Sequence, residues 1–116
     1  MGPERLFAMA VAKVYPLYLA KIARKGRNKE ELDAVIHWLT GYDAAALATV
    51  LAVGRSLAAF FAGAPALNPA RLAVTGVICG IRVEEIADPL MREIRILDKL
   101  VDELAKGRPM VKILRG

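Results

Sequence analysis

The sequence predicts an all-α fold, a compact bundle of about five or six helices in a single domain. Its 116 residues are the usual size of one domain and can bury a core without metal or disulfide. Hydrophobic residues make up 56% of the chain, which argues against extended disorder. In segments that begin at a capping residue and end at a glycine, the apolar residues recur at helical spacing. We expect one domain over residues 1–116, with a tail at 108–116 that is held less tightly.

An apolar stripe followed by a glycine predicts the first helix. The stripe consists of Val11, Val14, Tyr15, Tyr18 and Ile22. We expect Pro16 in the first turn, where its missing N–H group costs nothing, and Gly26 just beyond the last turn. Asn28 then predicts the N-cap of a second helix, with Glu31 at the capping-box position. Gly41 is expected to end this second helix.

Capping residues also predict two short helices in the middle of the chain. Asp43 is expected to cap a helix over residues 44–53, and Ser56 a shorter one that carries two phenylalanines. The stretch 44–67 is the only candidate membrane segment, and Arg55, together with two glycines and a proline, interrupts it. We therefore expect no membrane span.

A cap followed by proline, Asn68-Pro69, predicts a further helix over residues 70–79. This helix would be buried, because nearly all of its residues are apolar. A short strand is the alternative, since β-branched residues also occur here. The glycines of the pattern Gly76-x-x-x-Gly80 are expected to let another helix approach closely.

The longest helix is predicted over residues 88–106, opened by a second cap-and-proline pair, Asp88-Pro89. Its apolar stripe consists of Leu90, Ile94, Leu97, Val101 and Leu104, and it is widened by Ile96 and Leu100. Such a wide stripe indicates a helix that packs inside a bundle. Asp102 and Lys106 are expected to form an i,i+4 ion pair. The apolar residues of the tail are expected to dock on the bundle or on a partner.

Four segments together match a known pattern. They cover residues 13–18 (KVYPLY), 38–43 (WLTGYD), 75–86 (TGVICGIRVEEI) and 88–95 (DPLMREIR). In order and spacing the chain resembles a bacterial family known as domain of unknown function 2200, and the alanine-rich stretch 44–59 departs most from it. The resemblance implies a small helical prokaryotic protein. It implies no activity and no catalytic residue.

The residue types most used as metal ligands and nucleophiles occur once each. His37 is expected as a surface histidine beside Asp33, and Cys79 as a buried, unreactive thiol in an apolar stretch. A Cys79–His37 dyad stays open as an alternative. We expect no metal site and no cofactor, because too few ligands are present. A single cysteine also rules out an internal disulfide, which fits a reducing cytoplasm.

A candidate polar pocket lies near a helical turn that is predicted at residues 84–86. Its members are Arg71, Arg82, Glu84 and Glu85. Carboxylates can act as acids, bases or Mg²⁺ ligands where a cleft perturbs their pKa. The alternative is a solvated helix start. A small ligand-binding or enzymatic domain is therefore one functional hypothesis.

The net charge of +5 is concentrated near the start of the chain, where seven Lys and Arg residues precede residue 30 and Glu4 is the only acid. A candidate basic contact is formed by Lys21, Arg24, Lys25 and Arg27. The helix-turn-helix pattern over residues 19–40 does not support sequence reading, because three acids at the start of its second helix would repel phosphate. A weak, nonspecific nucleic-acid contact through this basic turn is a second functional hypothesis.

A candidate aromatic patch spans the first two helices and consists of Tyr15, Tyr18, Trp38 and Tyr42. Such a group belongs either to the core or to a half-exposed binding surface. The leading hypothesis is a non-catalytic binding or interaction protein that self-associates through apolar helix faces. It rests on the high hydrophobic fraction, the wide stripe of the last helix and the lack of catalytic groupings. Its expected partner is a second copy or another protein.

Overall fold

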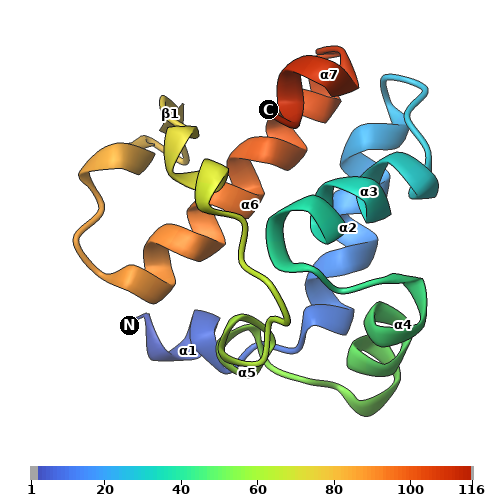
Figure 1. The fold of residues 1–116 in the computed structure, drawn as a ribbon, viewed down its shortest axis with the longest axis vertical. Coiled ribbons are helices and arrows are strands. Elements are labelled where there is room, and N and C mark those ends of the chain that lie inside the picture. Colours follow the sequence, from blue (N-terminus) through green and yellow to red (C-terminus); the bar gives the residue numbers. More distant parts are fainter. Residues whose placement is uncertain (1–2, 116) are drawn as a thin grey trace.

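Seven α-helices, two short 3₁₀ helices and one small hairpin make up the computed structural model over its described residues, 3–115 (Figure 1). The α-helices are α1 (Glu4–Phe7), α2 (Val11–Ala23), α3 (Lys29–Thr40), α4 (Ala44–Val53), α5 (Leu57–Ala62), α6 (Pro89–Ala105) and α7 (Met110–Ile113). Between α5 and α6 come η1 (Pro69–Ala73), β1 (Val77–Ile78), β2 (Ile81–Arg82) and η2 (Val83–Glu85). The predicted, mostly helical fold class is confirmed.

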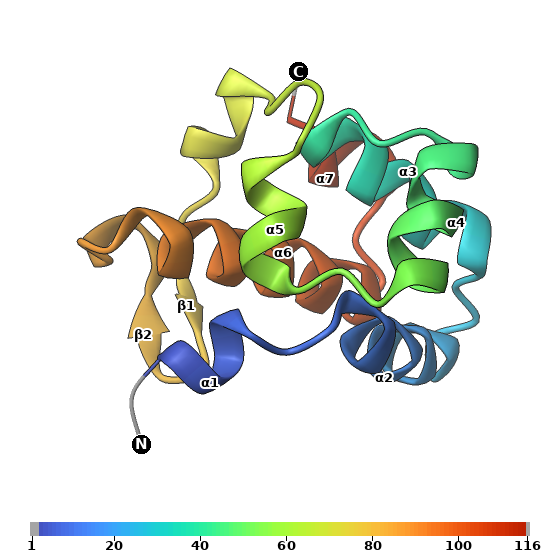
Figure 2. The same ribbon diagram turned by 90° about the horizontal axis from the view of Figure 1, so that it is seen from below.

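Helix α6 runs through the middle of the molecule, with α2 on one side and the hairpin on the other (Figure 2). It also contacts α3, α5, η2 and α7. Its buried apolar residues are Ile94, Ile96, Leu97, Leu100, Val101 and Leu104. Each such side chain contributes roughly 1.5–3 kcal/mol when it leaves water. The wide stripe therefore faces the core, as the bundle interpretation predicts.

Helix ends form where the capping residues predict them. At the start of α3, the Glu31 N–H donates to Asn28 Oδ1 over 3.0 Å and the Asn28 N–H donates to Glu31 Oε1 over 3.2 Å, which completes the capping box. Gly26 and Gly41 have φ angles of 71° and 84° just beyond α2 and α3. Side chains also accept a bond from the N–H three residues on at Asp43, Ser56 and Asp88.

Helix α2 begins earlier than its proline indicates. It starts at Val11, so Pro16 lies in its second turn and the prediction of a first-turn proline is wrong. A short antiparallel bridge fixes this start: the Val11 N–H donates to the Arg55 carbonyl and the Leu57 N–H to the Met9 carbonyl, each over 2.9 Å. Because Pro16 has no N–H, α2 lacks one i→i−4 bond at this turn.

The predicted helix over residues 70–79 is wrong. The 3₁₀ helix η1 ends after five residues, and the chain then forms a hairpin in which Ile78 pairs with Ile81. Cys79 and Gly80 are the turn residues, with φ angles of 53° and 76°, as a type I′ turn requires. Pairing of β-branched residues around this turn outweighs the helix signal of the cap. The expected close approach at Gly80 is also wrong, because a Cβ there would meet nothing within 4 Å.

The tail packs against the bundle through α7. Ile113 is fully buried, and the Arg115 side chain donates to Glu103 Oε2 on α6 over 2.6 Å. Met110 and Leu114 are partly buried against the core. Met110, Ile113 and Leu114 therefore dock on the chain's own bundle, which was one of the two outcomes expected, whereas Val111 is 79% exposed.

Exposed apolar side chains come from several elements of the described chain. The most exposed large ones are Leu17 (67%), Val53 (64%), Leu72 (53%), Val77 (51%) and Val111 (79%). Single exposed hydrophobic residues of this kind are ordinary on protein surfaces. No single helix within residues 3–115 is long and apolar enough to cross a membrane, and only α3 and α4 taken together, bent by 93°, reach the necessary length and composition.

Candidate functional site

An open groove of about 710 Å³ lies between the C-terminal half of α3 and the segment 64–69. Its walls include His37, Trp38, Leu67, Pro69 and Leu114. Trp38 is half-buried there. Among the described residues, no Lys, Arg, Asp or Glu lines this groove. We refer to it below as the Trp38 groove.

Backbone hydrogen bonds hold the two walls of the Trp38 groove together. The Ala66 N–H donates to the Thr40 carbonyl and the Asn68 N–H to the Leu39 carbonyl, each over 3.0 Å. These bonds use carbonyl groups that the last turn of α3 leaves without helical partners. Gly41 permits the contact, because a Cβ on it would lie 2.8 Å from the Ala66 nitrogen. The groove therefore depends on glycine at this position.

Three polar groups face solvent along the Trp38 groove. His37 Nδ1 lies 3.2 Å from the Tyr42 carbonyl, which can only accept, so in the neutral imidazole Nδ1 carries the proton and Nε2 is the acceptor. Asn68 Oδ1 accepts the Ala70 N–H over 2.9 Å, which leaves its amide N–H groups as donors. The indole N–H of Trp38 has no hydrogen-bond partner within residues 3–115. His37 is exposed as predicted, but its partner is this carbonyl rather than a carboxylate.

The four aromatic residues of the predicted patch have separate environments. Tyr42 is 4% exposed, stacks on Phe60 with ring centroids 4.8 Å apart, and donates to the Phe60 carbonyl over 2.7 Å. Tyr15 donates to an Asp33 carboxylate oxygen, and Tyr18 donates to one of Asp98. The three tyrosines thus pack in the core or hydrogen-bond at its edge, and of the four aromatic residues only Trp38 lines the groove.

Burial controls the ionisation of two of these tyrosines. Burial, followed by the hydrogen bond and the negative charge of Asp33, raises the pKa of Tyr15 to about 12. Burial and the neighbouring Asp98 raise the pKa of Tyr18 well above its ordinary value. Asp98 also accepts from Arg95 Nη1 over 2.9 Å, which compensates its charge. Both phenols therefore act as hydrogen-bond donors to carboxylates, not as general bases.

The predicted basic contact is divided between paired and unpaired cations. Lys21 lies 3.2 Å from Asp102, and Arg27 lies 2.6 Å from Glu31. Arg24 and Lys25 are exposed, and neither forms an ion pair with any described residue. Arg27 also donates to the carbonyl of Arg108, which brings a second basic segment beside the first. Sequence spacing alone does not show this contact across 81 positions.

Two buried carboxylates at the end of α6, Asp102 and Glu103, form ion pairs with cations of both basic segments. Asp102 is 9% exposed and is bracketed by Lys21 at 3.2 Å and Lys106 at 2.9 Å, so the predicted Asp102–Lys106 pair is confirmed. Burial acts to raise the pKa of Asp102, but hydrogen bonds and charges of the two lysines outweigh it, and the pKa is lowered. Glu103 is 5% exposed and pairs with Arg108 and Arg115 at 2.9 and 2.6 Å. The role of Glu103 was not predicted.

The members of the predicted polar pocket do not converge on one site. Arg71 lies 2.8 Å from Glu93 of α6, away from any partner in the predicted set. Arg82 and Glu84 form a loose pair at 3.8 Å on the surface, and Glu85 is exposed. Glu84 accepts the Gly76 N–H over 3.0 Å, and this bond lowers the pKa of its carboxyl group. These contacts brace the end of the hairpin.

Cys79 is exposed, so the prediction of a buried thiol is wrong. The physical reason is the hairpin, which places this residue at the tip of a turn instead of inside a helix. Its Sγ atom lies 3.6 Å from Arg95 Nη1 and has no contact with His37 among the described residues. No group of three or more His, Cys, Asp or Glu within residues 3–115 could hold a metal ion.

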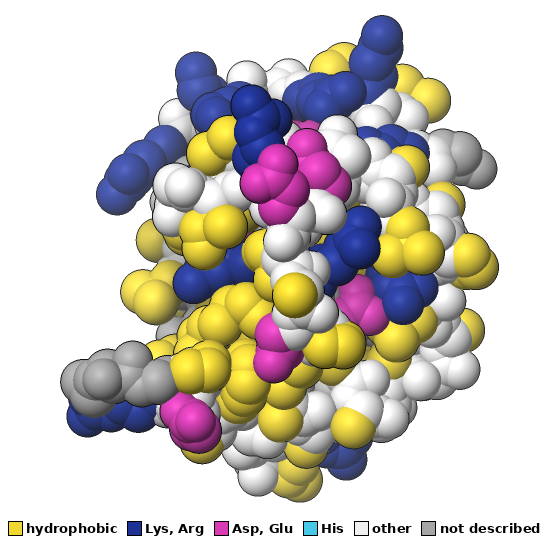
Figure 3. Space-filling model, turned by 90° about the vertical axis from the view of Figure 1, so that its left-hand side faces the viewer, with side chains coloured by type: hydrophobic (Ala, Val, Ile, Leu, Met, Phe, Trp, Pro, Cys, Tyr) yellow, Lys and Arg dark blue, Asp and Glu magenta, His cyan; other side chains and the backbone are white. Residues whose placement is uncertain are grey.

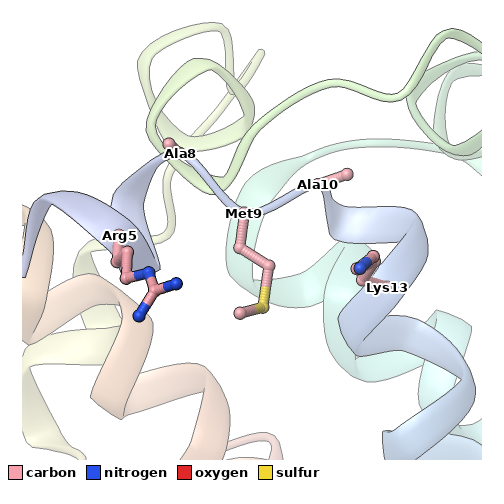
Figure 4. Close-up of a pocket in the computed structure, with 5 residues that line it drawn as sticks. All are labelled: Arg5, Ala8, Met9, Ala10 and Lys13. Carbon is pink, nitrogen blue, oxygen red and sulfur yellow. The ribbon is translucent and has the colours of Figure 1, made fainter.

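A second cavity, of about 560 Å³, lies between α1 and the start of α2. Figure 4 shows Arg5 of α1 and Lys13 of α2 on either side of Met9, which lies on the connecting segment. Neither cation was predicted as a site residue. Carboxylates are missing from its lining among the described residues, so it offers no acid–base pair.

Comparison with known proteins agrees with the fold and adds no activity. A crystal structure titled "uncharacterized protein SP1917" superimposes with a TM-score of 0.90 and is 46% identical in sequence, covering 98% of this chain and 93% of that one. No protein of curated function matches the chain significantly. A family model described as "uncharacterized protein conserved in bacteria" matches residues 5–115. This match shows that the chain belongs to the bacterial family called domain of unknown function 2200, as its motifs predicted.

Proposed function

We propose that the protein is a non-catalytic interaction protein whose Trp38 groove binds an apolar segment of a partner protein. The observation that carries the proposal is an uncharged, tryptophan-lined groove on a chain in which 25% of residues are charged. The centres of protein interfaces are depleted in charged residues, and tryptophan is enriched at their energetic hot spots. A reducing cytoplasm is the compartment we infer, because the lone thiol of Cys79 is exposed.

The apolar stripe of the last helix does not support self-association, because it lies inside the fold. Its residues Ile94, Leu97 and Leu104 are each at most 2% exposed. We therefore infer that self-association, which the buried stripe cannot provide, would use the Trp38 groove. A second copy of the chain is the first occupant to test.

The polar groups of the groove match those of a peptide backbone. The indole N–H of Trp38 and the amide of Asn68 can donate to carbonyl groups, while Nε2 of His37 can accept from an N–H. An extended segment would place its apolar side chains between Trp38 and Leu67 and leave its backbone bonded at the edges. An open groove of this kind suits such a segment better than an enclosed small molecule.

The only tryptophan of the chain makes this proposal directly measurable. We would follow Trp38 emission and native mass while raising the protein concentration, and then while adding peptides selected from a displayed random library. Binding in the groove shifts the emission maximum, because the indole ring loses water contacts. A shift with dimer formation identifies a second copy, and a shift that requires a peptide identifies another protein.

Two exposed prolines of one connecting segment give a matched pair of variants. Pro69 lines the groove and Pro65 does not. Pro69→Glu places a charge in the groove and is expected to weaken binding at least about tenfold, a loss of about 1.4 kcal/mol. Pro65→Glu is expected to bind as the parent does. Equal binding by both variants, or no emission shift with any occupant, would overturn the proposal.

A further inference from the structure

We propose that one end of the molecule binds the phosphate backbone of duplex nucleic acid without reading its sequence. This end consists of residues 21–33, from the end of α2 into α3, and residues 102–115, from the end of α6 through α7, and we call it the cationic end. It is separate from the Trp38 groove and stands independently of the function proposed for that groove. The inference rests on charge, on the exposure of the cations and on the absence of stacking side chains.

The fold joins two basic segments that are far apart in sequence. The Arg27 side chain donates to the Arg108 carbonyl, and Lys21 and Lys106 share Asp102. Segments 21–33 and 102–115 together contain nine Lys and Arg residues and five Asp and Glu residues, a surplus of four in a chain whose net charge is +5. Figure 3 shows the side of the molecule that carries the hairpin, and there too Lys and Arg side chains lie along the upper edge, with Asp and Glu side chains just below them. Most of the protein's net charge therefore belongs to the cationic end.

At the end of α6, the cations are more exposed than the two acids with which they pair, while Glu30 of α3 is exposed. Asp102 and Glu103 are 9% and 5% exposed. In contrast, the side chains of their partners Lys106 and Arg108 are 69% and 42% exposed. Charges that lie in water attract an approaching polyanion, while buried and paired carboxylates repel it only weakly.

Three exposed cations of the cationic end have no partner among the described residues. They are Arg24 and Lys25, which follow α2, and Lys112, which lies on α7. A phosphate that binds them displaces no ion pair. Cations without internal partners can release counterions from nucleic acid on binding, which is the main source of nonspecific affinity.

Duplex phosphate is the favoured partner because the cationic end lacks the side chains that other partners require. Single strands are held by stacking of bases on aromatic rings, and segments 21–33 and 102–115 contain no aromatic residue. Sequence reading needs a helix start in the major groove, but the first turn of α3 carries Glu30 and Glu31, which repel phosphate. A membrane surface needs several apolar residues to insert, and the large apolar side chain most exposed here is Val111.

The test measures binding to a fluorescent random-sequence DNA duplex by anisotropy at several salt concentrations. Three phosphate contacts predict a logarithmic salt slope of about −2.7, or about 40-fold weaker binding at 200 mM than at 50 mM salt. Arg24→Glu with Lys25→Glu is expected to lower affinity at low salt by at least about tenfold and to reduce the slope by about 1.8. Lys112→Glu, on α7, is expected to reduce the slope by about 0.9.

A control with the same charge change separates this surface from net charge alone. Lys13→Glu with Arg82→Glu reverses two exposed cations outside the cationic end. This control is expected to keep the salt slope of the parent, and circular dichroism verifies the fold of every variant. The proposal is overturned if affinity is flat in salt, if the control loses as much as the Arg24/Lys25 variant, or if Lys112→Glu has no effect. It is also overturned if anionic vesicles bind and the duplex does not.

Discussion

Replacing Gly41 with alanine tests how the groove is built. Gly41 has φ = 84°, a conformation that costs a residue with a Cβ roughly 1–2 kcal/mol. The new Cβ would also lie 2.8 Å from the nitrogen of Ala66 and 3.0 Å from its Cβ, so segment 64–69 must move away. That movement breaks the Ala66–Thr40 bond, worth about 0.5–1.5 kcal/mol. The expected loss of unfolding free energy is about 2–3 kcal/mol.

Gly54→Ala is the matched control for this prediction. Gly54 has φ = 70°, but a Cβ on it would meet nothing within 4 Å, so only the conformational cost applies. The gain from a stiffer unfolded chain is the same at both sites and cancels in the comparison. Urea unfolding should therefore show Gly41→Ala less stable than Gly54→Ala by about 1 kcal/mol at an unchanged m value. Equal losses would refute the close approach of the two groove walls.

Three further predictions concern local features. Asn28→Ala removes the capping box of α3 and should lower the unfolding free energy by about 1 kcal/mol in urea; an unchanged midpoint would contradict the cap. Folding raises the pKa of Tyr15 above its ordinary value near 10, so the stability it confers is present below pH 10 and is lost as pH rises toward 12. Absorbance titration of the parent and Tyr15→Phe should show one late phenol missing in the variant. Cys79 should react with Ellman's reagent in the native protein, because its thiol is exposed. A reaction that occurs only after denaturation would show that the thiol is buried.

Helix ends were predictable because their determinants are local. Asn28, Asp43, Ser56 and Asp88 each satisfy an N–H group three residues away, which sequence spacing shows directly. The central place of α6 followed from a stripe too wide for a surface helix. In both cases, the stabilising contacts involve residues that can be identified from their spacing in the sequence.

The region between α5 and α6 was not predicted, because two local signals compete there. The cap of Asn68 and Pro69 favours a helix, while the β-branched residues on either side of Cys79 and Gly80 favour a hairpin. Asn-Gly and Asp-Gly are the usual type I′ turn signals, and Cys79-Gly80 is not one of them. A non-glycine residue with φ = 53° is held there by the pairing of its neighbours. Exposure of Cys79 follows from the hairpin and could not be predicted while a helix was assumed.

Neither candidate surface could be assembled from sequence, because each joins segments that are distant in the chain. The Trp38 groove needs segment 64–69 to fold back on the end of α3. The cationic end needs Arg27 beside Arg108. Sequence patterns identified Trp38 and the first basic turn as candidates. Only the three-dimensional contacts show that the four aromatic residues lie in separate environments and that a second basic segment lies beside the first.

Helix α7 connects the two proposed surfaces physically. Leu114 forms part of the groove wall, while Lys112 belongs to the cationic end. A four-residue helix has little stability of its own, so its position depends on the buried Ile113 and on the ion pair between Arg115 and Glu103. A ligand that binds either surface only when α7 is docked must stabilise the docked state. By thermodynamic linkage such a ligand would also favour binding at the other surface, although each proposed activity is tested on its own.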